Sequence, residues 1–160
     1  MAGGTPATDA LALAGVEFVL RPYEHDPGTT AYGDEAAAAL GVDPLRIFKT
    51  LVIDIGAARP ELAVAVLPVG TQLDLKRFAA ALGAKKASMA DADQVTRSTG
   101  YVLGGVSPVA QRVQLPTLID ETAQLWETIL VSAGKRGLQV ELSPTDLADA
   151  VSASFADIAR

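Results

Sequence analysis

The chain has 160 residues, of which 49% are hydrophobic, which fits one domain with its own core. It contains no cysteine, which excludes a disulfide framework, a cysteine nucleophile and thiolate metal sites. The net charge of −6 argues against sequence-independent coating of DNA or RNA.

The first half of the chain predicts helices and strands in turn. Thr5-Pro6 is typical of a helix start, and this helix should end near Gly15. Residues 16–20 predict a strand, and the alanine-rich residues 34–40 predict a helix. Residues 47–55 and 62–67 predict two strands of a hairpin, because both are apolar and turn residues separate them.

The second half adds more helices and a second hairpin. Asp74 caps an amphipathic helix that Gly83 ends, and Ser88 with Asp91 indicates a capping box for the next helix. After a short strand at 117–119, the segments before and after Gly134–Gly137 predict a hairpin of 128–132 with 138–142, and Ser143-Pro144 starts a last helix. Because helices and strands do not alternate strictly, we predict an α+β fold: one domain with a mixed, largely antiparallel sheet surrounded by helices.

Lys49 is the most informative residue in the strand predicted at 47–55. Successive side chains of a strand point to opposite faces, so Lys49 shares a face with Ile47, Leu51, Ile53 and Ile55. An ammonium on an apolar face loses hydration and needs an anionic partner, a shifted pKa or a ligand. Two interpretations stay open: Lys49 binds a substrate, or it lies at a sheet edge and extends its amine into water.

Two glycine-rich segments could bring backbone close to a ligand. Residues 99–108 contain three glycines but lack the lysine of a P-loop and the spacing of a dinucleotide-binding loop, so they also fit an ordinary turn. The turn at 132–137 carries Lys135 and Arg136, which suit phosphate contact or any exposed hairpin.

Histidine chemistry is limited because His25 is the one histidine. It stands in a polar loop, where a role in shaping that loop is favoured over that of a base or a metal ligand.

Residues 76–112 carry a net charge of +4, which suits either phosphate contact or a solvated surface. We expect no metal and no cofactor. With no signal-peptide pattern and no membrane-spanning stretch, we expect a cytoplasmic protein that binds no membrane.

Taken together and in order, these segments resemble the free-standing YbaK-type aminoacyl-tRNA deacylases, relatives of the editing domain of bacterial prolyl-tRNA synthetase. The resemblance runs from near residue 5 to the C-terminus and implies a single deacylase domain over residues 1–160. It rests on residues 23–27, 48–51, 72–76, 81–86, 99–101, 104–108, 134–138 and 155–159.

The resemblance implies a trans-editing hydrolase that deacylates mischarged Cys-tRNA(Pro), with prolyl-tRNA synthetase as a partner. Cysteine is similar in size to proline, so a second site must remove the wrong product. In this family the thiol of the substrate is thought to attack its own ester, which needs positioning and oxyanion stabilisation from the enzyme. The residues implied are Lys49, Gly104 and Ser132 as catalytic, and Tyr23, Tyr32, Thr50, Gly105, Ser107 and Gln139 as substrate-binding.

Two positions depart from the family pattern. Gln139 stands where the family typically has aspartate, and Ala133 where glycine is common. An amide keeps hydrogen bonding but loses charge, which leaves room for a different amino acid, such as alanine in Ala-tRNA. A non-catalytic module that binds tRNA or a synthetase is the alternative from another class.

Overall fold

A computed structural model describes residues 4–160 of the chain. The helices are α1 (Pro6–Leu13), α2 (Tyr32–Leu40), α3 (Leu75–Ala81), α4 (Ala92–Thr99) and α5 (Pro144–Val151), with a 3₁₀ helix η1 (Glu121–Leu125). The strands are β1 (Val19–Pro22), β2 (Phe48–Asp54), β3 (Leu62–Pro68), β4 (Ser88–Met89), β5 (Thr117–Asp120), β6 (Ile129–Lys135), β7 (Leu138–Leu142) and β8 (Ser154–Ala156).

The larger of two sheets has the strand order β4-β2-β3-β5-β8. β2 and β3 form the expected antiparallel hairpin, with Lys49 opposite Leu67, whereas β5 and β8 join in parallel. One face of this sheet packs against Phe78 of α3 and Ile158, and the other contributes Val64 to a core shared with the smaller sheet. Burial on both faces explains why β3 is apolar throughout instead of alternating.

The smaller sheet is antiparallel, with the order β1-β7-β6. Ser132 of β6 lies opposite Gln139 of β7, and the register shifts between Ser132 and Lys135. A parallel bridge between Ile47 and Leu130 links the two sheets. The α+β class with a mixed, largely antiparallel sheet is thus confirmed, with the strands divided between two sheets.

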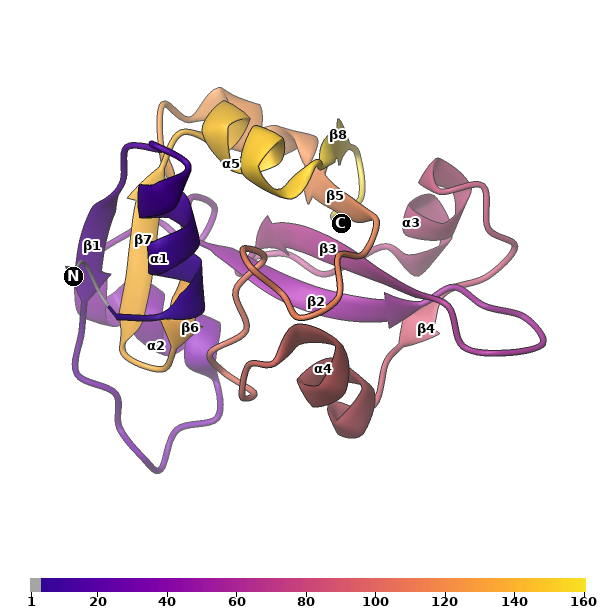
Figure 1. Cartoon of the computed structure of the whole chain (residues 1–160), viewed down its shortest axis with the longest axis horizontal. Helices are drawn as coiled ribbons and strands as arrows, with labels where there is room; N and C mark the ends of the chain where they lie inside the picture. The colour runs from indigo at the N-terminus through magenta and orange to yellow at the C-terminus, as the bar shows by residue number, and fades with distance from the viewer. Residues whose placement is uncertain (1–3) are drawn as a thin grey trace.

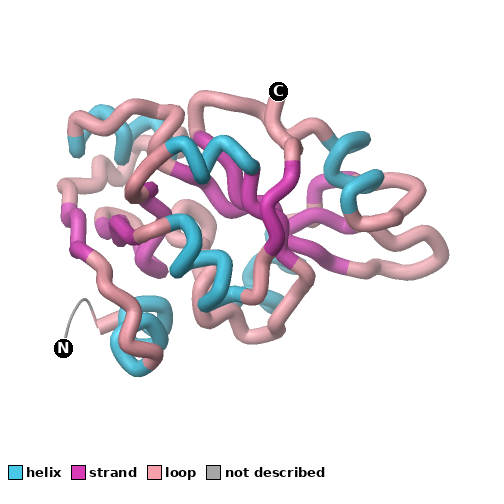
Figure 2. The backbone as a smooth tube through the Cα atoms, turned by 90° about the horizontal axis from the view of Figure 1, so that it is seen from above, coloured by secondary structure: helices cyan, strands magenta, loops and turns pink. Residues whose placement is uncertain are grey.

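Helices and loops surround the larger sheet in the middle of the molecule (Figure 2), whereas β1 lies at the outer edge of the smaller sheet (Figure 1). α1 lies against the smaller sheet, α5 runs across the top of the view between β7 and β8, and α3 and α4 lie above and below the β2–β3 hairpin (Figure 1). Leu11 of α1 and Leu147 of α5 are fully buried in the core that β6 and β7 share. Within residues 4–160, no helix combines the length and the apolar character that crossing a membrane requires.

The predicted helix caps are largely confirmed. Thr5, Asp74 and Ser143 each accept a hydrogen bond from a backbone N–H in the first turn of their helices. Gly41 ends α2 in the left-handed conformation, with φ of 65°. These features depend on a few neighbouring residues, which is why the sequence indicates them.

Two local predictions need correction, and two short strands were missed. The strand expected at 16–20 begins only at Val19, because the Val16 amide donates to the Leu11 carbonyl and still belongs to the end of α1. Ser88 does not cap α4. It belongs to β4, where it pairs with Asp54 of β2, and the capping box of α4 joins Asp91 to Gln94. The short strands β4 and β8 were not predicted, because two or three residues carry no periodic signal.

Candidate active site

A cavity of about 470 Å³ follows the outer edge of β2. β4 pairs with β2 at Ile53 and Asp54, and the Ala90 amide donates to the Val52 carbonyl over 3.1 Å, so the edge from Phe48 to Leu51 has no β4 partner. Residues from both sheets, from the start of α2, from the β4–α4 segment and from the glycine-rich loop line it. They are Tyr32, Gly33, Ile47, Phe48, Lys49, Thr50, Leu51, Val52, Val69, Met89, Ala90, Ala92, Val95, Leu103, Gly104, Val106, Ser132 and Gln139.

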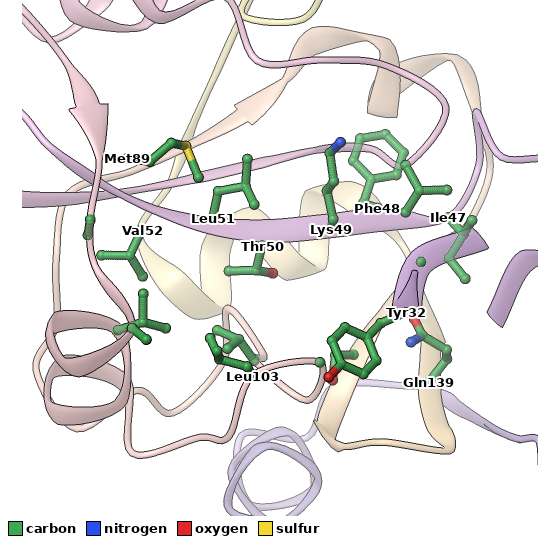
Figure 3. A pocket seen from close by; sticks show the side chains of 18 residues that line it. Tyr32, Ile47, Phe48, Lys49, Thr50, Leu51, Val52, Met89, Leu103 and Gln139 are labelled. Carbon is green, nitrogen blue, oxygen red and sulfur yellow. The ribbon is translucent and has the colours of Figure 1, made fainter. Parts of the chain in front are cut away.

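Consecutive residues of β2 reach the cavity from opposite sides of the strand. Lys49 and Leu51 point to one side, and Thr50 and Val52 point to the other, where Tyr32, Leu103 and Gln139 also lie (Figure 3). The alternation of a strand requires this arrangement. The cavity therefore wraps around an open strand edge, with the ammonium on one side and neutral polar groups on the other.

Lys49 is half-buried and tied to the protein by one hydrogen bond. Its Nζ donates to the carbonyl of Thr71 over 2.7 Å. Burial lowers the pKa of Lys49, and the nearby carboxylate of Asp34 opposes this shift in part. Among the cavity residues that the structure describes, Lys49 carries the sole formal charge. Its two further N–H groups can donate to an anionic or carbonyl oxygen of a ligand.

Two polar atoms on the other side of β2 are buried without a partner. The Oγ1 of Thr50 and the Oε1 of Gln139 make no hydrogen bond within residues 4–160. Gln139 is only 7% exposed. The Ser132 hydroxyl, opposite Gln139, accepts from the Gly134 amide over 3.2 Å. Because an unpaired buried polar atom is costly, Thr50 and Gln139 mark a place where a bound ligand or water can supply the missing bonds.

Gly104 allows the glycine-rich loop to approach Tyr32. Its φ is +84°, and an added Cβ would stand 2.6 Å from the Tyr32 ring. The Gly105 amide is already used, because it donates to the Val102 carbonyl over 2.9 Å. By contrast, the Gly104 amide has no backbone acceptor among the described residues. It is therefore free to donate to a ligand oxygen.

Arg136 holds the cavity side of Tyr32 in place. Its guanidinium carbon lies 4.9 Å from the centroid of the Tyr32 ring, and its Nε donates to the Leu103 carbonyl over 2.8 Å. It thus connects the β6–β7 turn to α2 and to the glycine-rich loop. The sequence suggested phosphate contact or mere exposure for this arginine and gave no sign of this packing.

His25 lies in the loop between β1 and α2, and its ring nitrogen Nδ1 is 2.6 Å from the Glu35 carboxylate. Glu35 also accepts from the Asp26 amide, and the contact with His25 is the main cause that lowers the pKa of Glu35. This pair fastens the loop to α2. In the range 4–160, no three His, Asp or Glu side chains are grouped so that they could hold a metal ion.

The cavity brings together most of the residues expected from the sequence. Tyr32, Lys49, Thr50, Gly104, Ser132 and Gln139 all line it. Three others lie outside the lining. Tyr23 packs against the α2 cluster, and Gly105 fits closely against the backbone of Lys135. The buried hydroxyl of Ser107 accepts from the Val109 amide, which makes it part of the loop's own structure.

Sequence reasoning missed the apolar wall formed by the β4–α4 segment. Met89, Ala90, Ala92 and Val95 line the cavity from there. The Asp91 cap marks where α4 begins, and this was the only signal in the sequence. Nothing local shows that the segment returns to the edge of β2.

Comparisons with known proteins agree with this geometry. Residues 25–150 match the aminoacyl-tRNA editing domain family, and the chain therefore belongs to that family. It is an aminoacyl-tRNA deacylase, an enzyme that hydrolyses the ester of mischarged tRNA.

Individual relatives support the same class. The chain is 42% identical over 125 residues to the Enterococcus faecalis protein named "Putative Cys-tRNA(Pro)/Cys-tRNA(Cys) deacylase EbsC", covering 78% of this chain and 75% of that protein. The crystal structure of hypothetical protein APE2540 has a TM-score of 0.84 at 26% identity and covers 97% of this chain and 99% of the other. A structure described as "a putative trans-editing enzyme for prolyl tRNA synthetase" has a TM-score of 0.81 at 24% identity, with 97% and 95% covered, and supports the fold.

Proposed function

We propose that this enzyme deacylates mischarged Cys-tRNA(Pro) in trans. The observation that carries the proposal is the apolar cavity around an open strand edge, with the Lys49 ammonium on one side of the strand and neutral polar groups on the other. An apolar cavity suits a small amino acid side chain, and a half-buried ammonium suits the ester or a phosphate of the terminal nucleotide. The name of the Enterococcus relative supports the choice of cysteine.

In the proposed reaction the substrate supplies the nucleophile. The chain has no cysteine, and its one histidine is paired with Glu35. The cysteinyl thiol would lose its proton and attack the ester carbonyl. The bond to the ribose oxygen would then break, that oxygen would take the proton, and water would open the released cyclic thioester. The Gly104 amide would stabilise the oxyanion, Lys49 and Ser132 would position the ester, and Tyr32 and Thr50 would contact the aminoacyl nucleotide. Tyr23, Gly105 and Ser107 would support these groups from outside the lining.

Deacylation of a panel of mischarged tRNAs tests the proposal. We expect cysteinyl-tRNA(Pro) to be hydrolysed faster than the alanyl and seryl forms. Lys49→Ala should lower the rate by about 100-fold or more, because it removes the one charge in the cavity, without unfolding the protein. Arg59→Ala, which removes an exposed positive charge in the turn between β2 and β3, outside the cavity, is the control. A Lys49→Ala enzyme that works at the wild-type rate would exclude this role for Lys49.

A second substrate, Ala-tRNA, is favoured by one observation: Gln139 presents a neutral amide to the cavity. The same panel separates the two, because fastest hydrolysis of alanyl-tRNA would replace the first proposal. Binding of tRNA without turnover would instead indicate a non-catalytic module.

We further propose prolyl-tRNA synthetase as a partner, in the cytoplasm where charged tRNAs are used. The acidic chain should bind tRNA weakly by itself. Adding the synthetase should therefore raise the apparent affinity for tRNA(Pro). An unchanged affinity would contradict this partnership.

A further inference from the structure

Two buried oxygens in the cavity, Thr50 Oγ1 and Gln139 Oε1, have no hydrogen-bond partner among the described residues. Gln139 is 7% exposed, and both residues lie on the same side of β2 (Figure 3). The amide oxygen of Gln139 only accepts hydrogen bonds, whereas the Thr50 hydroxyl both donates and accepts. A bound group that satisfies Gln139 must therefore carry an N–H or O–H.

The chemistry of an aminoacyl ester restricts which group this is. Gln139 belongs to the central strand of the smaller sheet and is buried, whereas the rest of a tRNA must leave through the open side of the cavity. The buried end thus receives the aminoacyl group. In cysteine or alanine the only N–H or O–H group of the amino acid is the α-amine, because a thiol is a weak donor and a methyl group donates nothing.

The charge of the cavity supports the same choice. No carboxylate lines it in the part of the chain that the structure describes, so recognition of an amine cannot depend on an ion pair there. An amide oxygen accepts from –NH₂ and from –NH₃⁺ alike, whereas a carboxylate favours the ammonium. Gln139 can therefore bind the amine over a range of pH.

We propose that Gln139 is a specificity-determining residue that reads the free α-amine of the substrate, so that the enzyme accepts aminoacyl esters and rejects N-acylated ones, such as peptidyl or formylaminoacyl esters. This inference rests on the proposed function. An N-acyl group removes all but one of the donors and adds bulk at the buried end. The enzyme would thereby spare the tRNAs whose amine is already blocked.

Binding of non-hydrolysable analogues tests this inference. The probes are 3′-amino-3′-deoxyadenosine coupled by an amide to cysteine, to 3-mercaptopropionate, which lacks the amine, or to N-acetylcysteine. Dissociation constants are measured by calorimetry. For the wild type we expect the loss of the amine to weaken binding about tenfold, and the N-acetyl probe to bind more weakly still.

Two variants of Gln139 separate a loss of amine recognition from a loss of folding. Gln139→Leu should bind the cysteinyl probe as weakly as the wild type binds the deamino probe, with no further loss when the amine is removed. Gln139→Glu should restore the preference for the amine and make it depend on pH, because a carboxylate favours the ammonium. Circular dichroism and thermal unfolding check that both variants fold.

The outcomes distinguish a failure of the role proposed for Gln139 from a failure of the proposed deacylase function. Equal binding of the cysteinyl and deamino probes by the wild type would overturn the role of Gln139 and leave the proposed deacylase intact. A Gln139→Leu protein that still prefers the amine would do the same. If the wild type binds no probe and hydrolyses no mischarged tRNA, the proposed function fails and the inference falls with it.

Discussion

Gln139 and Glu141 lie two residues apart on the same face of β7, yet their surroundings are opposite. Glu141 accepts hydrogen bonds from Arg21, from Arg46 over 2.7 Å and from the Thr128 hydroxyl over 2.7 Å. Gln139 is more deeply buried and leaves its amide oxygen without a partner within residues 4–160. The hydrogen-bonding capacity at the Glu141 end of β7, the saturated end, is therefore used by the protein itself. The Gln139 end, the unsaturated end, keeps an acceptor that a ligand can use.

The saturated end has a structural purpose. Arg21 comes from β1, Arg46 precedes β2 and Thr128 precedes β6, so the Glu141 carboxylate joins segments of both sheets. Its side chain is 18% exposed, which limits screening by water. The comparison teaches that burial alone does not identify a binding residue; a buried polar atom with its bonds unmade is the better sign.

The largest effect on stability is expected when the saturated end is broken. Glu141→Ala leaves two arginines without their acceptor and should lower the free energy of unfolding by about 2 kcal/mol. Asp157→Ala is the control, because its ion pair with Arg77 is exposed and should contribute less than about 0.5 kcal/mol. Urea denaturation measures both. Equal losses in the two variants would refute the contrast.

Acid should reduce the stabilisation that the Glu141 carboxylate provides. The Thr128 hydroxyl, followed by Arg21 and Arg46, holds the pKa of Glu141 below its usual value of 4.5. The carboxylate therefore adds stability above that usual value, and this stability is lost as the pH falls through the lowered pKa. The difference in unfolding free energy between wild type and Glu141→Gln should thus shrink from pH 7 to strongly acidic pH. A difference independent of pH would show that the charge is not involved.

The smallest effect is expected at the unsaturated end. Gln139→Leu removes an unpaired polar group and should change the unfolding free energy by less than about 1 kcal/mol, toward stabilisation. Glu141→Leu makes a similar change two residues away and should destabilise clearly. If Gln139→Leu lowered the free energy of unfolding as much as Glu141→Leu does, Gln139 would have a structural role. The contrast between the two ends of β7 would then be lost.

The sequence by itself determined the features that depend on neighbouring residues. The caps at Thr5, Asp74 and Ser143 and the hairpins of β2 with β3 and of β6 with β7 follow from short patterns. The face of Lys49 also follows, because a strand must alternate: Leu51 and Ile53 pack together in one cluster on that face. The order of several short motifs was enough to indicate the family.

Only the tertiary structure decided which of these residues meet. It divided the strands between two sheets, brought the β4–α4 segment to the edge of β2 and left Ser107 outside the cavity. It also showed that Glu141 is saturated while Gln139 is not, although both are polar residues in one alternating strand. The physical reason is that hydrogen-bond satisfaction depends on partners far away in the chain, such as Arg46 for Glu141, whereas caps and alternation depend on the nearest few residues.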